Sequence, residues 1–392
     1  MNLFDLFSLT ITIAAVLSFI NIRYIKLPFT IGLMILSLVV SVVLLIGGQW
    51  LHQDVILFFE DFLRQIDFSN FLLDFMLGFI LFAGSLHTDF GRLKKFKTPI
   101  LIFATVGVLI STFVVGAFLY FLLPLFLGHV DFVHCLIFGA LISPTDPIAV
   151  LAILKQANAS ESVEAYITGE SLFNDGVGVV VFLTLTHIAH VGIAEVGPTD
   201  ISILLAKEIA GGIFLGIVLG YVGYIMMKKI DHYQTEVMIT LALVLGGTYF
   251  AELLHFSLPL AMVAAGLFIG NKGVEEAMSE TTGDYVNKFW ELIDEIMNAI
   301  LFVIIGLEIL IIPFELSYLY IGLICIVLVI IARWISLIIP TRAFKLNRRF
   351  EKNTVLVMTW GGLRGGISIA LALSLQDTFD RNLFVPVTYI IV

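Results

Sequence analysis

One hydrophobic stretch decides how this chain must fold: VHCLIFGALISPTDPIAVLAIL, residues 133–154. It is long enough to cross the roughly 30 Å hydrocarbon core of a bilayer as a helix. Near its middle, however, it carries Asp146 between two prolines, Pro144 and Pro147. A proline interrupts a helix, and a charge inside a span costs at least about 2.5–3.5 kcal/mol on insertion scales. The stretch therefore predicts a broken membrane span with a functional carboxylate.

The composition of the whole chain also indicates an integral membrane protein. Of its 392 residues, 59% are hydrophobic and 13% are charged, whereas soluble domains average about 45–50% and about 25%. The mean hydropathy is +1.05. Asp and Glu outnumber Lys and Arg by 31 to 21, which disfavours nucleic-acid binding. The two cysteines lie in hydrophobic runs and form no metal or disulfide framework, so no cofactor is expected.

Hydrophobic runs of spanning length predict an all-α polytopic protein with about 13 transmembrane helices. Twelve complete runs cover residues 4–20, 28–48, 70–86, 99–127, 133–154, 167–189, 201–227, 235–255, 257–270, 289–312, 317–340 and 354–375. A thirteenth begins near residue 382, and we expect the printed chain to stop inside this last helix. The N-terminus lacks the features of a signal peptide, so the first helix is expected to remain in the mature protein.

The distribution of basic residues predicts the orientation, because positively charged loops stay in the cytoplasm. Even-numbered connections carry only Arg64 and Arg381, and the acidic second connection is expected to face outward. Odd-numbered connections carry 16 basic residues: Arg23, Lys26, Arg92, Lys94, Lys95, Lys97, Lys155, Lys228, Lys229, Lys272, Lys288, Arg342, Lys345, Arg348, Arg349 and Lys352. We therefore expect the N-terminus outside and the C-terminus in the cytoplasm.

Two further spans carry ionisable groups at a similar depth to Asp146. The sixth contains GESLFNDG, residues 169–176, and the twelfth contains GGLRGG, residues 361–366. At ~1.5 Å per residue, Asp146 lies ~13 Å in from Lys155, Asp175 lies ~16 Å in from Glu164, and Arg364 lies ~16 Å in from Asn353. All three are therefore expected close to the midplane of the membrane.

The sixth span presents polar side chains on two adjoining faces. Ser171 and Asp175 are four residues apart and share one face, while Glu170 and Asn174 share the next. One helix thus offers a carboxylate with a hydroxyl and a carboxylate with an amide.

The balance of charge predicts a mobile ion. Glu170 and Arg364 can form a structural ion pair between helices, which leaves Asp146 and Asp175 without a fixed counter-charge. We expect a cation or a proton to take that place. Other charges within spans lie mostly toward the ends, where snorkelling or helix pairing explains them, and Arg333 is the most notable of the group Asp74, Glu252, Glu308 and Arg333.

The broken helices predict two inverted repeats within one transporter unit, residues 1–392. Pro144 and Pro147 break the fifth span, and paired glycines loosen the twelfth at 361–362 and 365–366. Spans 1–6 (residues 1–191) and 8–13 (residues 235–392) then form the repeats, with the seventh span (201–227) as the link. Interrupted helices at corresponding positions of two inverted halves indicate the midplane site of a transporter.

The motifs SPTDP (143–147), GESLFNDG (169–176) and GGLRGG (361–366) resemble those of the sodium/proton exchanger family, in its electroneutral NhaP-like branch. The similarity extends over essentially the whole chain and includes LFAG (81–84) and AAGL (264–267). A departure is Leu258, where a glycine is common in the family. The resemblance implies a homodimer in the plasma (inner) membrane, with unwound, crossing helices 5 and 12, that transports sodium and serves pH homeostasis.

The same resemblance implies a role for each polar residue of the motifs. Asp175 would be the principal carboxylate for the cation and the proton, and Asp146, Thr145 and Ser171 would complete the Na⁺ site. The resemblance makes three more residues supporting ones: Asn174, Glu170 and Arg364, the last two as a charge pair between helices 6 and 12. Oxygen ligands suit a hard cation.

Exchange follows if the cation and the proton compete for one carboxylate, because a bound cation favours its charged form. The resemblance implies one Na⁺ (or Li⁺) for one H⁺, since Asn174 stands where the electrogenic branch has a second Asp. K⁺ as the transported cation remains open.

Two other classes of protein use paired intramembrane acids. An intramembrane aspartyl protease needs two aspartates that share a proton, but its Gly-x-Gly-Asp and Tyr-Asp motifs do not surround Asp146 or Asp175. A cation channel favours rings of carbonyls or carboxylates from several subunits. Two inverted halves fit alternating access better, so we expect a transporter and not an enzyme.

Overall fold

The computed structural model describes residues 3–47, 71–126, 128, 130–147, 150–151, 153–154, 160–192, 197–310, 312, 315–346, 350–351 and 353–392. Within these ranges all the regular elements are helices. The predicted outward loop between the second and third spans, with Asp54, Glu60, Arg64 and Asp67, lies outside the described residues, as do Lys155, Arg348, Arg349 and Lys352.

The helices follow the thirteen predicted spans in order, which confirms the all-α fold. The first three spans are α1 (Leu3–Ile20) with η1 (Asn21–Ile25), α2 (Phe29–Gly47), and η2 (Phe71–Met76) with α5 (Leu77–Leu86). The fourth span is one continuous helical segment made of α6 (Phe90–Ile102), η3 (Phe103–Gly107), α7 (Val108–Leu122) and η4 (Leu123–Leu125). The fifth span begins with α8 (Phe132–Leu141), and the sixth is α10 (Glu161–Val191). The others are α11 (Pro198–Met227), α12 (Tyr233–Leu254), α13 (Leu258–Phe268) with η5 (Ile269–Gly273) and α14 (Val274–Glu276), α15 (Glu280–Glu308), α16 (Leu316–Ala343), α17 (Thr354–Trp360) with α18 (Gly366–Leu373), and, after η7 (Asp377–Phe379), α19 (Arg381–Ile391).

Several of these helices are long and apolar enough to cross a bilayer individually. Six such spans occur among the described residues: Ser8–Ile25, Phe90–Leu125, Glu161–Val191, Thr199–Met227, Tyr233–Leu254 and Leu316–Ala343. The two broken spans do not qualify as single helices because each is divided near its middle.

Two helices begin well before the predicted spans because polar side chains cap them. Asp89 accepts a hydrogen bond from Arg92 N at 3.1 Å, so α6 begins at Phe90 and takes in the basic residues predicted to be in a connection. Ser279 accepts from Thr282 N at 3.3 Å, so α15 begins at Glu280 and not near residue 289. The hydrophobic pattern alone could not show these polar first turns.

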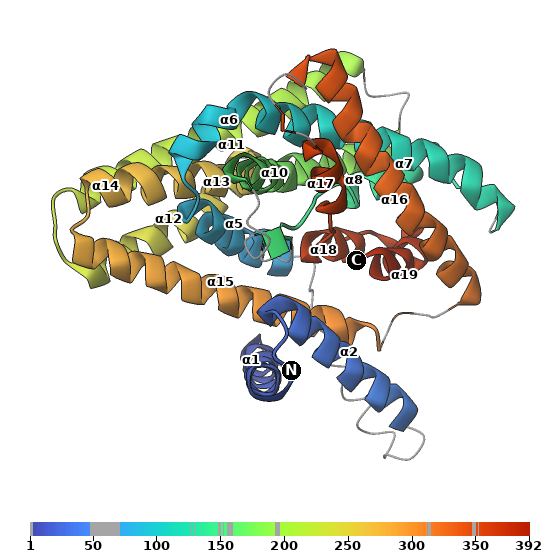
Figure 1. Ribbon diagram of the computed structural model, residues 1–392, viewed down its shortest axis with the longest axis horizontal. Helices are drawn as coiled ribbons and strands as arrows, with labels where there is room; N and C mark the ends of the chain where they lie inside the picture. Colours follow the sequence, from blue (N-terminus) through green and yellow to red (C-terminus); the bar gives the residue numbers. More distant parts are fainter. Residues whose placement is uncertain are drawn as a thin grey trace.

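The helices pack into two groups that meet at the centre of the molecule (Figure 1). We call α6, α7, α8, α10 and α16–α19 the core group, and α1, α2, α5 and α11–α15 the flanking group. Within the core group, α8 packs against α7 and α10, and α16 packs against α7 and α19. Within the flanking group, α13 packs against α5 and α11. The broken helices belong entirely to the core group.

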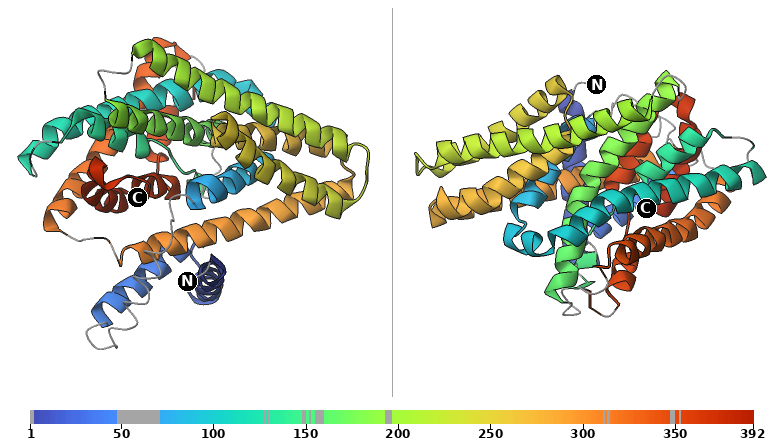
Figure 2. Two further views of the ribbon diagram at one scale, coloured as in Figure 1. Left: turned by 180° about the vertical axis from the view of Figure 1, so that it is seen from behind. Right: turned by 90° about the horizontal axis from the view of Figure 1, so that it is seen from above.

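The helices α1 and α2 lie on the outer side of α15, away from the core group (Figures 1 and 2). Small side chains allow α2 to approach α15 closely. Ser37 Oγ donates to Phe302 O at 3.1 Å, and Ser41 Oγ donates to Gly306 O at 2.7 Å. The helix α15 also packs against α5 and α12, and it contacts α18 of the second broken span.

Candidate functional site

The two predicted helix breaks are present, and their backbones cross. The fifth span leaves its helix after Leu141 and has no regular secondary structure through residues 143–147, and the twelfth is interrupted at 361–365 between α17 and α18. Asp146 N donates to Leu363 O at 2.9 Å, which joins the two breaks directly. Non-helical backbone is tolerated at membrane depth only where such partners satisfy it.

Arg364 hydrogen-bonds backbone carbonyls of the first break, just beyond the C-terminal end of α8. Its Nη1 donates to Ser143 O, and to Pro144 O at 3.0 Å. The C-terminal end of a helix carries a partial negative charge, which a guanidinium stabilises. Arg364 is 8% exposed, so this contact takes place inside the protein. The side chain of Arg364, which lies in the second break, therefore links that break to the first.

The predicted ion pair between Glu170 and Arg364 is wrong, because the partner of Glu170 is Arg333. The two nitrogens Nη1 and Nη2 of Arg333 each donate to one carboxylate oxygen of Glu170, the second at 2.7 Å. Arg333 Nε also donates to Met358 O at 3.3 Å. The two side chains are 8% and 2% exposed. This buried, two-pronged pair ties α10 to α16, and through Met358 to α17.

The polar faces of α10 position Thr145 within the first break. Asn174 Nδ2 donates to Thr145 Oγ1 at 2.8 Å, and Asn174 Oδ1 accepts from Thr145 N at 3.5 Å. Ser171 Oγ donates to Thr145 O. All three residues are at most 5% exposed. Ser171 and Asn174, one from each of the two predicted polar faces of α10, thus fix the backbone that leads into Asp146.

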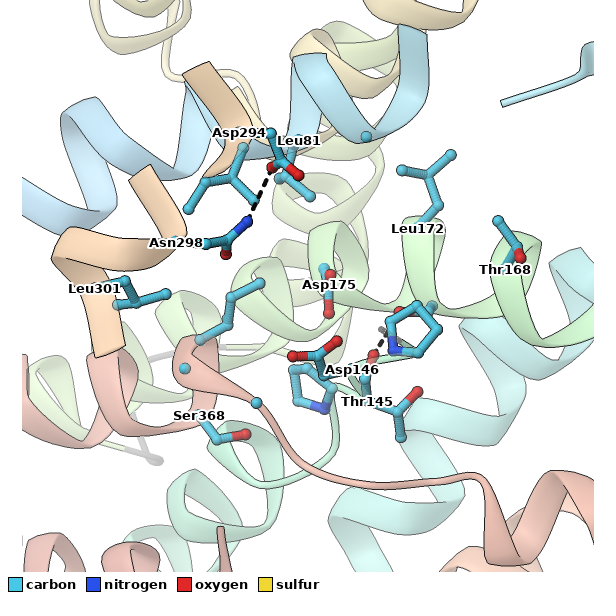
Figure 3. A pocket seen from close by; sticks show the side chains of 18 of the residues that line it. Leu81, Thr145, Asp146, Thr168, Leu172, Asp175, Asp294, Asn298, Leu301 and Ser368 are labelled. Atoms are coloured by element: carbon cyan, nitrogen blue, oxygen red, sulfur yellow. Dashed lines mark hydrogen bonds between the residues drawn. The ribbon is translucent and has the colours of Figure 1, made fainter. Parts of the chain in front are cut away.

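The carboxylates of Asp146 and Asp175 face each other next to this hydrogen-bonded segment (Figure 3). Among the residues that the structure describes, Asp175 makes no ion pair. The second break passes close behind Asp146: a Cβ on Gly365 would lie 2.6 Å from Asp146 Cβ and 2.7 Å from its Oδ2. Only glycine allows this approach. Two like charges at one place favour a proton or a cation between them.

A cavity of about 230 Å³ contains these carboxylates and lies between the two helix groups. The core group contributes both breaks and α10, and the flanking group contributes α5 and α15. The cavity extends to Thr88, just beyond the end of α5, on the side of the membrane where the odd-numbered connections lie. Its polar lining residues are Thr88, Thr145, Asp146, Thr168, Ser171, Asp175, Asp294, Asn298 and Ser368.

Asp294 and Asn298 were not among the sequence-predicted site residues. They lie four residues apart on α15 and line the cavity opposite Asp175 (Figure 3). A span expected to begin at residue 289 places Asp294 in its first turns, where a charged residue does not by itself indicate a functional site. The signal that was available is the i, i+4 spacing of an acid and an amide on one face of a hydrophobic helix.

The chemistry of the lining fits a hard monovalent cation. Carboxylate, hydroxyl and amide oxygens are the donors present, and such oxygens bind hard cations. No group of three or more His, Cys, Asp or Glu residues suited to a metal ion occurs in the described ranges.

Comparison with known proteins agrees with this chemistry. A family model described as "Sodium/hydrogen exchanger, transmembrane" matches residues 9–392. The chain is 47% identical over 392 residues to the Na⁺/H⁺ antiporter NhaP of Pseudomonas aeruginosa, covering 99% of this chain and 92% of that protein. It is 35% identical over 325 residues to the Na⁺/H⁺ antiporter NhaH of Halobacillus aidingensis, covering 82% and 78%.

The fold is shared with a solved antiporter. The structure of the sodium proton antiporter MjNhaP1 from Methanocaldococcus jannaschii at pH 8 superposes with a TM-score of 0.73 at 18% identity, covering 98% of this chain and 93% of that one. The named relatives are transporters and not proteases, so the alternative of an intramembrane aspartyl protease is dropped. On the family match and the extent of these similarities, the chain belongs to the sodium/hydrogen exchanger family.

Proposed function

We propose that this multi-pass membrane protein exchanges Na⁺ (or Li⁺) for H⁺, one for one, at a site formed by Asp175, Asp146, Thr145 and Ser171. The observation that carries the proposal is the pair of facing carboxylates beside two crossed helix breaks, in a cavity between two groups of helices (Figure 3). The family match and the names of the relatives support the same activity.

Competition for the carboxylates couples the two ions. A bound cation favours the charged form of a carboxylate, whereas a proton removes its charge. Asp175 therefore holds either the cation or the proton, and loading one species expels the other. Asn174, one residue before Asp175, hydrogen-bonds Thr145 as a neutral amide and adds no further charge. If Asp146 keeps one charge state through the cycle, Asp175 alone exchanges its ion for a proton and the exchange is electroneutral.

Alternating access follows from movement of the core group against the flanking group. The cavity is lined by both groups, so a displacement of one relative to the other closes it on one side and opens a path on the other. Within the core group, the buried Glu170–Arg333 pair and the contacts of Arg364 hold the broken helices together as one body. The proposed repeats, residues 1–191 and 235–392 joined by 201–227, each contribute one broken helix.

The protein's setting is also a proposal. We infer a plasma (inner) membrane location with the N-terminus outside and the C-terminus in the cytoplasm, because the basic residues concentrate in odd-numbered connections. In this orientation the cavity opens toward the cytoplasm. A homodimer is inferred from the family resemblance alone.

Transport by the purified protein in liposomes tests the function. With the interior acidic and the membrane voltage clamped, external Na⁺ should make the interior more alkaline, and Asp175→Asn should abolish this response while the protein remains folded. Parallel additions of Li⁺ and K⁺ identify the cation. Wild-type rates in Asp175→Asn would contradict the site. Cation flux without any proton flux would indicate a channel.

A further inference from the structure

Between the described helices, the chain passes from one helix group to the other at three places, and one of them is much shorter than the others. Residues 87–89 join α5 of the flanking group to α6 of the core group on the proposed cytoplasmic side. Residues 192–197 join α10 to α11, and residues 309–315 join α15 to α16, both on the proposed outer side. At about 3.3–3.6 Å per residue, the chain from Leu86 to Phe90 reaches at most ~14 Å, whereas each outer connection reaches ~25 Å or more. The two groups are therefore most tightly tethered at residues 87–89.

The flanking group holds the start of this short connection firmly. The helix α5 ends against η5, the π-helical turn that follows α13. The two backbones touch here, because a Cβ on Gly270 would clash with Leu86 O and a Cβ on Gly266 would clash with Ser85 Oγ. Single π-helical turns within helices frequently lie at functional sites. The end of α5 and η5 thus form one support for the connection.

Asn271 on η5 binds the connection on both sides of its last residue. Asn271 Nδ2 donates to Thr88 O at 3.0 Å and, within its own helix, to Leu267 O at 2.9 Å. Its Oδ1 accepts from Phe90 N at 2.9 Å. Phe90 N belongs to the first turn of α6, where backbone N–H groups have no partner within the helix. One amide of the flanking group, with both of its donors used, therefore holds the first residue of the core group.

The connection is also joined to the site. Thr88 lines the cavity that contains Asp175. The helix α6 packs closely on α10, since a Cβ on Gly169 would lie 2.7 Å from Leu93 Cδ2. Because α10 carries Asp175, a rotation of α6 about its first residue moves α10 and its carboxylate with it.

We propose that Asn271 is a positioning residue that fixes residues 87–90 as the hinge about which the core group turns during exchange. The proposal rests on the movement of the core group proposed above and adds the place about which that movement occurs. The first turn of α6 stays beside η5, so the displacement of the core group grows with distance from this hinge. A covalent bond between the groups at the hinge should then be tolerated, whereas a bond between them elsewhere should stop exchange.

Crosslinking at the hinge tests this directly. Phe90→Cys and Asn271→Cys are combined in the full chain, and the protein in liposomes is treated with a short bifunctional thiosulfonate reagent. Phe90 is exposed, whereas the native Cys135 and Cys325 are buried. Before crosslinking, the maximal rate of Na⁺/H⁺ exchange should be low because the Asn271 amide is missing. Crosslinking should restore it, because the covalent bond replaces the hydrogen bonds of that amide.

The matched pair lies between the same two groups but far from the hinge. Leu183 of α10 and Glu208 of α11 line one cavity of about 270 Å³ beside residues 255–257, on the proposed outer side. Crosslinking Leu183→Cys to Glu208→Cys with the same reagent should abolish exchange, since the groups must move apart or slide there.

Asn271→Ala separates the hinge from folding. Loss of the amide's hydrogen bonds should lower the maximal rate of exchange about fivefold. The Na⁺ concentration for half-maximal exchange should stay unchanged, because the carboxylates in the cavity keep their contacts. The control is Ser279→Ala, which removes a helix cap that lies entirely within the flanking group. It should lower the melting temperature but not the maximal rate.

Three results would overturn the hinge. They are loss of exchange when Phe90→Cys is crosslinked to Asn271→Cys, a wild-type maximal rate in Asn271→Ala, and exchange that survives the crosslink between Leu183→Cys and Glu208→Cys. In each of them the wild type still exchanges Na⁺ for H⁺. Failure of the proposed function would appear instead as no exchange in the wild type.

Discussion

The buried pair between Glu170 and Arg333 gives the sharpest test of how the core group is held together. Glu170→Gln keeps the shape of the side chain but removes the counter-charge of the Arg333 guanidinium, whose other hydrogen-bond partner among the described residues is Met358 O. Breaking one side of a buried ion pair costs about 3–5 kcal/mol because the remaining charge is uncompensated. At about 2 °C per kcal/mol for a large chain, the melting temperature should fall by about 6–10 °C.

A double-mutant cycle identifies the partner. If Arg333 is the partner, Arg333→Gln combined with Glu170→Gln should cost less than the sum of the two single changes, with a coupling of about 2–3 kcal/mol. Arg364→Gln combined with Glu170→Gln should be close to additive, because Arg364 binds the carbonyls of Ser143 and Pro144 instead.

The assay is loss of helical circular dichroism on heating in detergent, with all variants at one protein and detergent concentration. Wild-type stability in Glu170→Gln would refute the argument that the pair stabilises the core group. A strong coupling of Glu170 to Arg364, with additivity toward Arg333, would restore the pairing that sequence depth suggested.

Three further predictions concern the breaks and the connection before α17. Gly365→Ala should reduce exchange at least about tenfold, because the new Cβ would lie 2.6 Å from Asp146 Cβ; Gly246→Ala, whose Cβ would meet nothing within 4 Å, is the control, and liposome transport with both variants decides. Thr145→Val should destabilise the protein by about 1–3 kcal/mol, because it leaves the buried Asn174 amide without its acceptor, and an unchanged melting temperature would count against that contact. Hydrogen bonds from Ser162 and Ser160 lower the pKa of the exposed Glu351. The charged Glu351 therefore stabilises the fold above its unfolded-state pKa, and this stabilisation is lost as the pH falls through the lowered folded-state pKa. Ser162→Ala should weaken the dependence of the melting temperature on acidic pH, and a pH profile identical to that of the wild type would contradict the contact.

The order of the spans and the position of both breaks could be predicted from the sequence because each depends on local chemistry. The thickness of the bilayer sets the length of a hydrophobic run, and Pro144 or the Gly361–Gly362 pair interrupts a helix wherever it lies. The spacing of Ser171 with Asp175 likewise fixed which side chains share a face of α10.

The partner of Glu170 could not be predicted because the depth of a residue in the membrane does not say which helices are neighbours. Counted at ~1.5 Å per residue, Arg333 lies ~10 Å from residue 340 and Glu170 lies ~9 Å from Glu164, so Arg333 was as compatible with Glu170 in depth as Arg364 was. The choice depends on which helix lies beside α10, and the hydrophobic pattern does not specify it. Asp294 was missed for a related reason: the cap at Ser279 lengthens α15 and moves Asp294 from the first turns to the middle of the helix.

Proton release on cation binding tests the central claim of competition most directly. Purified protein in weakly buffered detergent receives NaCl, and the released protons are titrated while bound Na⁺ is counted. Competition at Asp175 predicts about one proton released per Na⁺ bound in the wild type at a pH where the site is protonated, and none in Asp175→Asn. Na⁺ binding without proton release in the wild type, or undiminished release in Asp175→Asn, would contradict the account.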